Sequence, residues 1–584
     1  MKKIVKSILA VGISTALTTT TANAATYEVI DKGAAELFKY TYAQQENNNG
    51  EMAISGTSAY NFPVQYQYLD EEDYDNIVRL ADTQHENVHE LDNIEDENAL
   101  RNGDPTANDL AWVIRYLEGI SSSLYQKVGD VVAMTNSGGD TQDFHVYDQK
   151  FDGTDQYTRS TTDFINGITN QGWVYGNGSS PYLPLDFTES DGDEVTHWVR
   201  DFSTRGFFSP DNGNTIIELL PPEHEHGGES AILDISENGI AVGYASTSVD
   251  QAAIDYINND DGGCADPDVI DDLPVEVCIQ NIRVGMYNSE AFKWVVNETG
   301  EVSSESLGYL VTPHEEDERE YVSYAQAVNI HGVAVGYAHG WWDEKVTSPD
   351  KNESRSLYAV VFKDGTAVDF TEDHSEQFDS RAYDINDSGI AVGHITNYVN
   401  GNLRTKFYYV DTNQENMEMV FPADFFNGSA STARSINETG FIVGEGEVET
   451  HNDSSVNPRR TNGFLYDMST DTFTNLNDFL PCESDYTIIE ARHINDNNEI
   501  SATALIKVPR RDAKGELMFD DQGNQLVEDV VRAVKLSPID GEVEDCSAVE
   551  EKVERQGAGL GLGAIFSLLT FGLARRIRSR SKKH

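Results

Sequence analysis

Residues 382–393 read Ala382-Tyr-Asp-Ile-Asn-Asp-Ser-Gly389-Ile-Ala-Val-Gly393, and this stretch decides the fold because it recurs along the chain. A short apolar strand ends at Ile385, and Asn386 begins a turn through side-chain hydrogen bonds to the backbone. Gly389 supplies the left-handed conformation that a tight hairpin needs at its last turn position. Gly393 lies inside the outgoing strand, where a glycine often marks the close approach of another backbone. The stretch therefore predicts a β-hairpin.

The same pattern returns with its turn residue at several other positions. The copies have their turn glycines at Gly172, Gly239, Gly332, Gly389 and Gly440. A sixth copy carries Asn498 instead, and Asn is among the residues that best tolerate a positive φ. Asn47-Asn-Asn-Gly50 is a degenerate seventh copy. Self-similarity of this kind is typical of repeat architectures.

A second pair of alternating segments follows each hairpin. Ala291–Val296, for example, leads into the turn Asn297–Gly300. Each unit thus offers four short strands, which is the content of one propeller blade. We predict an all-β, β-propeller-like array of about six or seven four-stranded repeats. A closed ring is favoured, and an open array is the alternative.

The pattern A-x-x-I-N-x-x-G-x-x-V-G, followed by A-F-x-W, resembles the HAF-type extracellular repeat. The resemblance covers roughly residues 27–545. It implies a propeller-like structure and no known activity, so it assigns no catalytic residue.

One segment has a different periodicity. Between about residues 70 and 127, apolar residues recur at helical spacing, and residues 110–117 form the stronger of two predicted helices. Thr106 or Asn108 is the predicted N-cap. We expect a helical hairpin inserted between the first two repeat units.

The N-terminus carries an export signal over residues 1–24. Lys2, Lys3 and Lys6 precede an apolar run, and Ala22-Asn-Ala24 fits the small-x-small cleavage rule. The mature chain is then predicted to start at Ala25, and a retained N-terminal anchor is the alternative. Residues 25–550 form the predicted ectodomain.

The C-terminus mirrors this arrangement. Residues 557–574 contain no charge and are long enough for a transmembrane or sorting helix, and residues 575–584 form a basic, cytoplasmic tail. The glycine-led start, apolar stretch and Arg cluster resemble the GlyGly-CTERM sorting signal, which implies a rhomboid-type protease as partner beside the export machinery. Gly557-Ala-Gly559 departs from the Gly-Gly pair of that signal. A retained membrane anchor and a cleaved tail therefore both remain open, and the expected location is the cell envelope.

Charge and cysteine content limit the function further. The net charge is −59, which excludes nucleic acid as a partner because the phosphate backbone would be repelled. Four cysteines in an exported chain predict disulfides. Cys264–Cys278 would close the long acidic loop of residues 250–272, which leaves Cys482–Cys546 as the second pair.

The metal signals are weaker. His85-Glu-Asn-Val-His89 matches H-E-x-x-H, which on a helix could bind zinc with Glu86 as general base and Glu118 as third ligand. The surrounding residues are polar, and the extension typical of such sites is missing. Residues 191–194 and 259–262 offer oxygen ligands for calcium without forming a twelve-position loop. Calcium is thus the one cofactor left open, with solvated acidic loops as the favoured interpretation.

The sequence therefore predicts an exported envelope protein that acts as a non-enzymatic binding or surface structural module with an unknown ligand. The alternative is a zinc-dependent hydrolase at residues 85–89.

Overall fold

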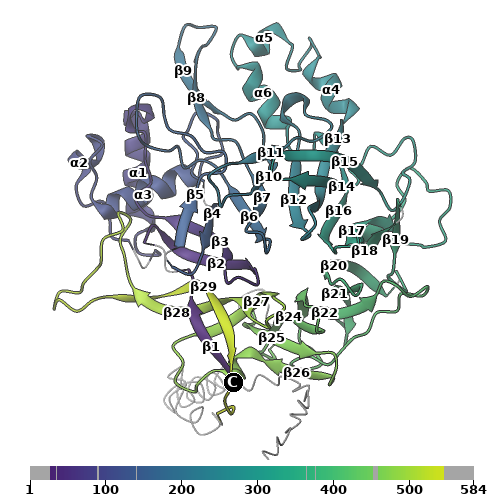
Figure 1. Ribbon diagram of the computed structural model, residues 1–584. Coiled ribbons are helices and arrows are strands. Elements are labelled where there is room, and N and C mark those ends of the chain that lie inside the picture. Colours follow the sequence, from purple (N-terminus) through teal and green to yellow (C-terminus); the bar gives the residue numbers. More distant parts are fainter. Residues whose placement is uncertain are drawn as a thin grey trace, which may run out of the picture.

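The computed structural model describes residues 26–544, apart from residues 34–35, 89–90, 130, 140, 364, 375 and 452–457. Seven small antiparallel sheets surround one axis as the blades of a propeller (Figure 1). The predicted all-β propeller is confirmed, and the seven blades form a closed ring. The predicted leader, the C-terminal helix and the basic tail lie outside the described residues.

Each blade runs from an inner strand at the axis to an outer strand. Blade 1 contains β2 (Phe38–Glu46), β3 (Met52–Ala59), β4 (Val131–Asn136) and β5 (Thr141–Phe144). Blade 2 contains β6 (Asp163–Ile168), β7 (Val174–Gly178), β10 (Arg205–Ser209) and β11 (Ile217–Leu219). Blade 3 contains β12 (Ser230–Ile235), β13 (Ile240–Val249), β14 (Tyr287–Asn297) and β15 (Gly300–Gly308). Blade 4 contains β16 (Ser323–Val328), β17 (Ala334–Trp341), β18 (Arg355–Lys363) and β19 (Thr366–Asp369).

The remaining blades vary slightly. Blade 5 has three strands, β20 (Gln377–Ile385), β21 (Ile390–Val399) and β22 (Asn402–Asp411), and an isolated bridge from Tyr409 to Val420. Blade 6 contains β23 (Ser431–Ile436), β24 (Phe441–Glu447), β25 (Thr461–Asp467) and β26 (Thr472–Asn475). Blade 7 combines both ends of the described chain, with β27 (Thr487–Ile494), β28 (Ile500–Pro509), β29 (Val527–Ile539) and, outermost, β1 (Thr26–Asp31).

The pairing of β1 with β29 closes the ring. The two strands are antiparallel and aligned from Thr26 opposite Ile539 to Asp31 opposite Val534. Blade 7 is therefore complete only when residues from both ends of the described chain meet.

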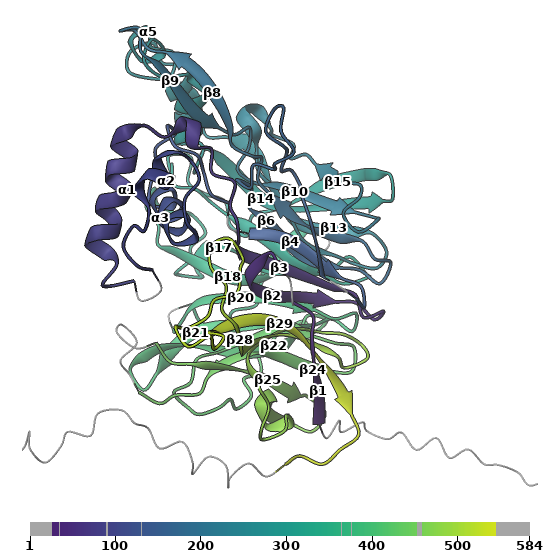
Figure 2. The same cartoon turned by 90° about the vertical axis from the view of Figure 1, so that its left-hand side faces the viewer.

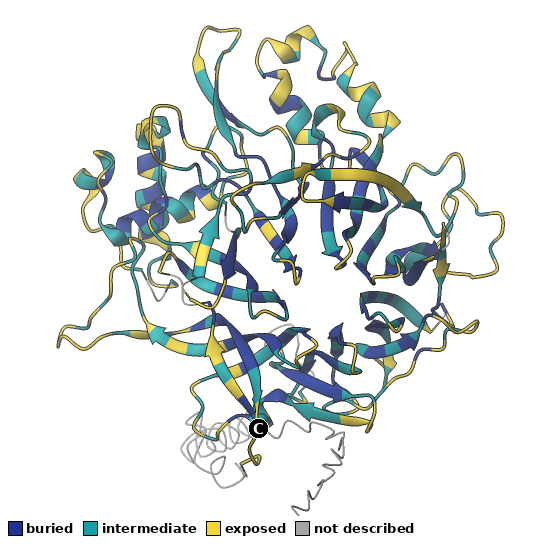
Figure 3. Cartoon of the chain, viewed as in Figure 1, coloured by how far each residue is buried: buried dark blue, intermediate teal, exposed yellow. Residues whose placement is uncertain are grey.

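Apolar side chains fill the spaces between neighbouring blades. Trp294 and Phe208, for example, pack in one cluster between blades 2 and 3, and Val360 and Val242 in another between blades 3 and 4. Figure 3 shows the buried residues along the blades, with exposed residues at the connecting loops. Because burial of apolar surface drives folding, each blade depends on its two neighbours for stability.

The repeated turns adopt the geometry that their sequence predicts. All five predicted turn glycines have φ between +77° and +85°, and Asn498 has φ of +60°. Gly50 of the degenerate copy has φ of +82°, so blade 1 uses the same turn. These turns join the inner strand of each blade to its second strand.

The second glycine of the repeat lies where two backbones nearly touch. A Cβ atom on Gly336 would lie 1.8 Å from the carbonyl oxygen of Tyr324, and one on Gly393 would lie 1.8 Å from that of Arg381. In both hairpins the inner strand shifts register beside this glycine, between Ala325 and Ala327 in the first case. The glycine is therefore required by close approach rather than by its own φ.

The asparagine that begins each turn also links the blades. Asn437, for example, accepts hydrogen bonds from the backbone N–H groups of Thr439 and Phe441 through Oδ1. Its Nδ2 donates to the carbonyl oxygen of Asn495, the corresponding residue of blade 7, at 3.1 Å. Such links at 2.9–3.3 Å start from Asn47, Asn329, Asn386, Asn437 and Asn495, and we call these residues with Thr169 and Ser236 the asparagine ring.

We expect Asn437→Ala to lower the free energy of unfolding by about 2 kcal/mol, because it leaves buried backbone groups without partners. Asn437→Ser should cost less, because a hydroxyl can serve the turn as Ser236 does, through the N–H of Ile240. Thermal and urea denaturation of the full-length protein measure both effects. Asn402→Ala, at an exposed strand end, is the control. Equal stability of Asn437→Ala and the control would contradict the structural role of this ring.

The predicted helices are present, but they interrupt blade 1 instead of separating the first two units. Three helices lie between β3 and β4: α1 (Glu71–Gln84), α2 (Glu97–Arg101) and α3 (Ala107–Glu118). Thr106 is the N-cap of α3, and its side chain accepts a hydrogen bond from the N–H of Asp109. Helical periodicity located the segment, whereas its place within a blade depends on strand pairing that the sequence does not display.

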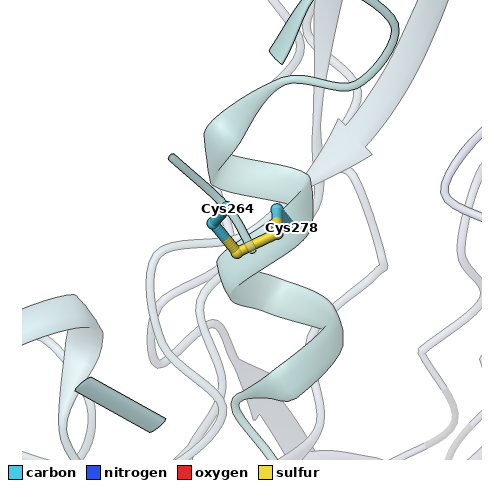
Figure 4. The surroundings of a disulfide bond; sticks show 2 residues. All are labelled: Cys264 and Cys278. Carbon is cyan, nitrogen blue, oxygen red and sulfur yellow. A yellow bond between two sulfur atoms is a disulfide. The ribbon is translucent and has the colours of Figure 1, made fainter. Parts of the chain in front are cut away.

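Further insertions extend blades 2 and 3. The hairpin β8 (Leu183–Thr188) and β9 (Glu194–Val199) lies between β7 and β10, and α4 (Gln251–Ile257), α5 (Pro267–Ile270) and α6 (Val275–Ile282) lie between β13 and β14. The stretch predicted as a long loop is thus partly helical. The Cys264–Cys278 disulfide is confirmed, with Cα atoms 5.7 Å apart, and ties this stretch to α6 (Figure 4). Three short 3₁₀ helices complete the fold: Tyr66–Tyr68, Glu225–Gly227 and Leu476–Phe479.

All of these insertions connect the second strand of a blade to its third strand. Because the strands alternate in direction, these connections and the blade-to-blade loops emerge on one face, and the asparagine-ring turns emerge on the other. In Figure 2, α1–α3 lie on the left side of the molecule and β8–β9 project above them. We call this the insertion face. Among the described residues, no helix is both long and apolar enough to cross a membrane.

Candidate functional site

The axis of the propeller contains a cavity of about 340 Å³. All seven inner strands line it, so every blade contributes to one site. The lining segments are residues 44–48, 166–170, 233–237, 326–330, 383–387, 434–438 and 492–496, with Tyr175 from β7. Its volume is within the range of about 300–1,000 Å³ that is common for small-molecule sites.

Acidic side chains accompany the asparagine ring at one end. In six of the seven blades, the side chain of the residue after the ring member accepts a hydrogen bond from the corresponding backbone N–H of the preceding blade, as Glu237 does from Asn170 at 2.8 Å and Asp387 from Ile330 at 3.0 Å. Burial, followed by repulsion from Asp387 and Asp496, raises the pKa of Glu237. These carboxylates therefore serve as blade-to-blade links.

Two carboxylates deeper in the wall also accept hydrogen bonds from the chain. Asp234 accepts hydrogen bonds from the Tyr175 hydroxyl at 2.9 Å and from the N–H of Val328 at 2.8 Å. Asp384 accepts from the N–H groups of Ile385 and Ile436 at 2.8 and 2.9 Å. Burial raises the pKa of Asp234 to about 7 and that of Asp384 to about 6. All four oxygens accept a bond from the chain, so each of these carboxyl groups joins its own blade to the next one.

Planar polar side chains occupy the next layer of the cavity. The residue three positions before each asparagine-ring member is polar in six blades and apolar in one. We call this layer the polar ring; it consists of Gln44, Asn166, Leu233, Gln326, Tyr383, Arg434 and Arg492. Amide, phenol and guanidinium groups offer donors and acceptors in fixed planes.

Aromatic and guanidinium groups adjoin this layer, and two of them, Tyr383 and Arg434, also line the cavity. The Tyr244 and Tyr324 rings lie 4.8 Å apart, and Tyr324 and Tyr337 lie 5.2 Å apart. The guanidinium of Arg381 lies 4.7 Å from the Tyr337 ring centroid, and that of Arg434 lies 5.1 Å from the Tyr383 ring centroid. We call Tyr244, Tyr324, Tyr337, Arg381, Tyr383 and Arg434 the tyrosine–arginine arc. It spans blades 3 to 6, and its tyrosines and arginines are partly exposed.

The arginines of this wall each have a carboxylate partner. Arg434 forms an ion pair with Glu445 at 2.7 Å, and Arg492 lies 3.3 Å from Glu490. Arg381 lies 3.3 Å from Asp379. Each of these arginines is therefore neutralised, and the other charged groups that line the cavity are carboxylates, so the wall disfavours an anionic ligand.

The described part of the predicted zinc motif, residues 85–88, lies beyond the end of a helix. Helix α1 ends at Gln84, and residues 85–88 form a turn and an irregular segment, so the spacing that would align His85 with a second histidine is not helical there. His85 Nδ1 lies 3.0 Å from the carbonyl oxygen of Ala81. His89 lies outside the described residues, and Glu118 is the last residue of α3. Sequence spacing suggested a helical face, but the helix stops before the motif.

The proposed calcium segments are turns. Residues 191–194 are at the β8–β9 turn, where Gly192 has φ of +94°, and residues 259–262 follow α4. Over the described part of the chain, no group of three or more His, Cys, Asp or Glu residues could hold a metal ion. Cys482 is disulfide-bonded, and Cys546 lies outside the described residues.

A family model described as a protein of unknown function (DUF3466) matches residues 3–576. The chain belongs to this family. No curated protein matches it.

The chain resembles several solved structures only weakly. A puromycin-hydrolyzing peptidase from Mycobacterium tuberculosis is 10% identical, with a TM-score of 0.36, over 87% of this chain and 56% of that chain. Prolyl oligopeptidase B from Galerina marginata is 10% identical, with a TM-score of 0.32, over 87% and 61%. The polysaccharide lyase Uly1 is 10% identical, with a TM-score of 0.35, over 72% and 86%. The match thus spans less than two thirds of each peptidase and transfers no activity to this DUF3466 protein.

Proposed function

We propose that this DUF3466 protein is an exported, non-enzymatic binding module of the cell envelope that presents the insertion face of its propeller to a ligand. The HAF-type repeat would build the scaffold, and the GlyGly-CTERM-like tail would anchor or sort it. The leader and tail patterns support export, and the acidic composition supports solubility outside the cytoplasm.

One observation carries the binding proposal. The recurring residues of the repeat have structural duties: the asparagines link blades, the first glycines form turns, and the second glycines permit close strand contact. The residues that differ between repeats form the polar ring and the insertion face. A rigid scaffold that holds variable side chains in a cavity is typical of a binding site.

We expect the mature protein, purified from the envelope of its producing bacterium, to begin at Ala25. Intact mass spectrometry checks this prediction, because retention of residues 1–24 adds a readily measured mass. A C-terminus near Gly557 would indicate sorting, and an intact tail would indicate an anchor.

The same preparation tests the non-enzymatic part of the proposal. Elemental analysis should find no stoichiometric zinc, and peptide and polysaccharide substrates should remain uncut. Bound zinc that disappears in His85→Ala, together with hydrolysis, would replace this proposal with the hydrolase alternative.

A further inference from the structure

We propose that the tyrosine–arginine arc and the polar ring bind a neutral oligosaccharide that enters from the insertion face. This inference rests on the proposed binding function and adds the site and the ligand class. The arc and ring form one surface, since Tyr383 and Arg434 belong to both.

Charge selects a neutral ligand. The chain carries −59 overall, so an anionic polymer would be repelled before it reached the axis. The arginines that could attract an anion inside the cavity are neutralised by Glu445, Glu490 and Asp379. The carboxylates that line the cavity already accept hydrogen bonds from the chain, as Asp234 and Glu237 do, so a cation would have to compete with the bonds that join the blades.

Aromatic groups select a ligand with flat apolar patches. Tyr324 contacts both Tyr244 and Tyr337, so its ring is held in one orientation by edge and tilted contacts. Tyrosine combines a large apolar face with a hydroxyl group at its edge. A pyranose ring has a complementary surface, because its axial C–H groups form an apolar face and its hydroxyl groups surround the edge.

The polar ring can satisfy those hydroxyl groups. The side chain of Gln326 forms no hydrogen bond with the described residues, whereas Gln44 and Asn166 donate only to nearby groups at 3.3 Å and at 2.6–3.3 Å. An amide can donate and accept in one plane, which matches neighbouring hydroxyl groups on a sugar.

His394 lies buried beside the arc. Its ring lies 5.5 Å from the Tyr383 ring, it is only 9% exposed, and its Nδ1 has no hydrogen-bond partner within the described chain. Burial, and secondarily Arg381 and Arg434, lowers the pKa of His394 to about 3, so the ring is neutral at physiological pH. The imidazole therefore adds no positive charge beside the arc.

Titration calorimetry with the full-length protein tests the inference on defined hexasaccharides. The neutral probes are cello-, laminari- and manno-oligosaccharides, and the charged probes are oligogalacturonate and chitosan of the same length. We expect at least one neutral hexasaccharide to bind, and the charged probes to bind about tenfold more weakly or not at all.

Variants locate the site. Tyr324→Ala should weaken binding by about tenfold through loss of the stacking face, and Tyr324→Phe should retain most of the affinity. Tyr256→Ala is the matched control, because Tyr256 is an exposed tyrosine on α4 of the same face. Near-ultraviolet circular dichroism establishes that each variant is folded.

Three results would overturn the inference: no neutral hexasaccharide binds, oligogalacturonate binds as tightly as the neutral probes, or Tyr324→Ala binds like the wild-type protein. If the wild-type protein and Tyr324→Ala capture an envelope partner equally strongly, the proposed binding function stands, but the tyrosine–arginine arc is not the binding site. Conversely, if a bound saccharide is cleaved, the protein is an enzyme and the proposed non-enzymatic function is wrong, but the binding site is supported.

Discussion

Replacement of Gly336 by alanine should lower the free energy of unfolding by about 3 kcal/mol or more, a large effect for one methyl group. The added Cβ would lie 1.8 Å from the carbonyl oxygen of Tyr324, 2.9 Å from its carbonyl carbon and 3.1 Å from the Cα of Ala325. All three atoms are backbone atoms of the paired strand, so no side-chain rotation can relieve the overlap. The two strands must separate, and the register shift beside Ala325 would be lost.

Gly428→Ala is the matched control for this prediction. Gly428 has no positive φ, and the nearest atom to an added Cβ is 3.6 Å away on Phe426, an ordinary contact. Urea denaturation of the two variants and the wild-type protein, followed by far-ultraviolet circular dichroism, compares their midpoints. Midpoints for Gly336→Ala and Gly428→Ala that agree within error would show that close backbone approach does not explain the second glycine of the repeat.

This glycine also shows how far the sequence can predict the fold. Its position within an outgoing strand indicated close approach of another backbone, and the structure identifies that backbone as the neighbouring strand of the same hairpin. The pattern involves only residues that are close in sequence, so the conformational preferences of single residues are enough to predict it. The same is true of Asn498, whose positive φ agrees with its place at a turn position.

Other features depend on contacts between distant residues. The sequence left the blade count between six and seven, because the copy at Asn47–Gly50 is degenerate and β1 carries no repeat motif. The structure pairs β1 with β29, across almost the whole described chain, and this pairing decides that the ring closes. The helices of residues 71–118 were recognisable by their period, but their position inside blade 1 depends on the pairing of β3 with β4.

The candidate site was missed for a related reason. Gln326 and Tyr383 occupy variable positions inside a repeat that attracts attention through its constant positions. An alignment of the seven copies with one another would have placed these residues in one layer, because equivalent positions in a closed ring face the same axis. The H-E-x-x-H spacing instead drew attention to residues 85–89, where α1 has already ended.

Replacement of Glu46 by alanine should have a comparable or larger effect, about 3–5 kcal/mol, because it leaves Lys535 with Glu499 alone and removes the carboxylate that faces the buried Lys32. Glu46 is 1% exposed, at the end of β2, and its carboxylate lies 2.6 Å from Nζ of Lys535 on β29. Lys535 also pairs with Glu499 at 2.6 Å, and Lys32, next to β1, lies 3.9 Å from Glu46. This cluster connects blade 1 to blade 7 at the point where the ring closes.

Burial opposes the charges of this cluster, and only their mutual attraction makes it tolerable. Burial raises the pKa of Glu46, whereas the ammonium groups of Lys535 and Lys32 act in the opposite direction. Replacement of Glu46 or Lys535 alone is therefore expected to lower the free energy of unfolding more than replacement of both residues together. A double-mutant cycle of Glu46→Gln and Lys535→Gln measures this coupling through thermal and urea denaturation.

Lys507→Gln with Asp529→Asn is the control cycle. These residues form an ion pair at 2.8 Å on exposed parts of the same blade, where solvent screens the interaction to about 1 kcal/mol or less. A coupling for Glu46 and Lys535 that exceeds this control would establish that the buried cluster helps to hold the ring closed. If the two cycles give equal couplings, the strand pairing of β1 with β29 and the apolar contacts between blades 7 and 1 must supply that stability without a specific ionic contribution.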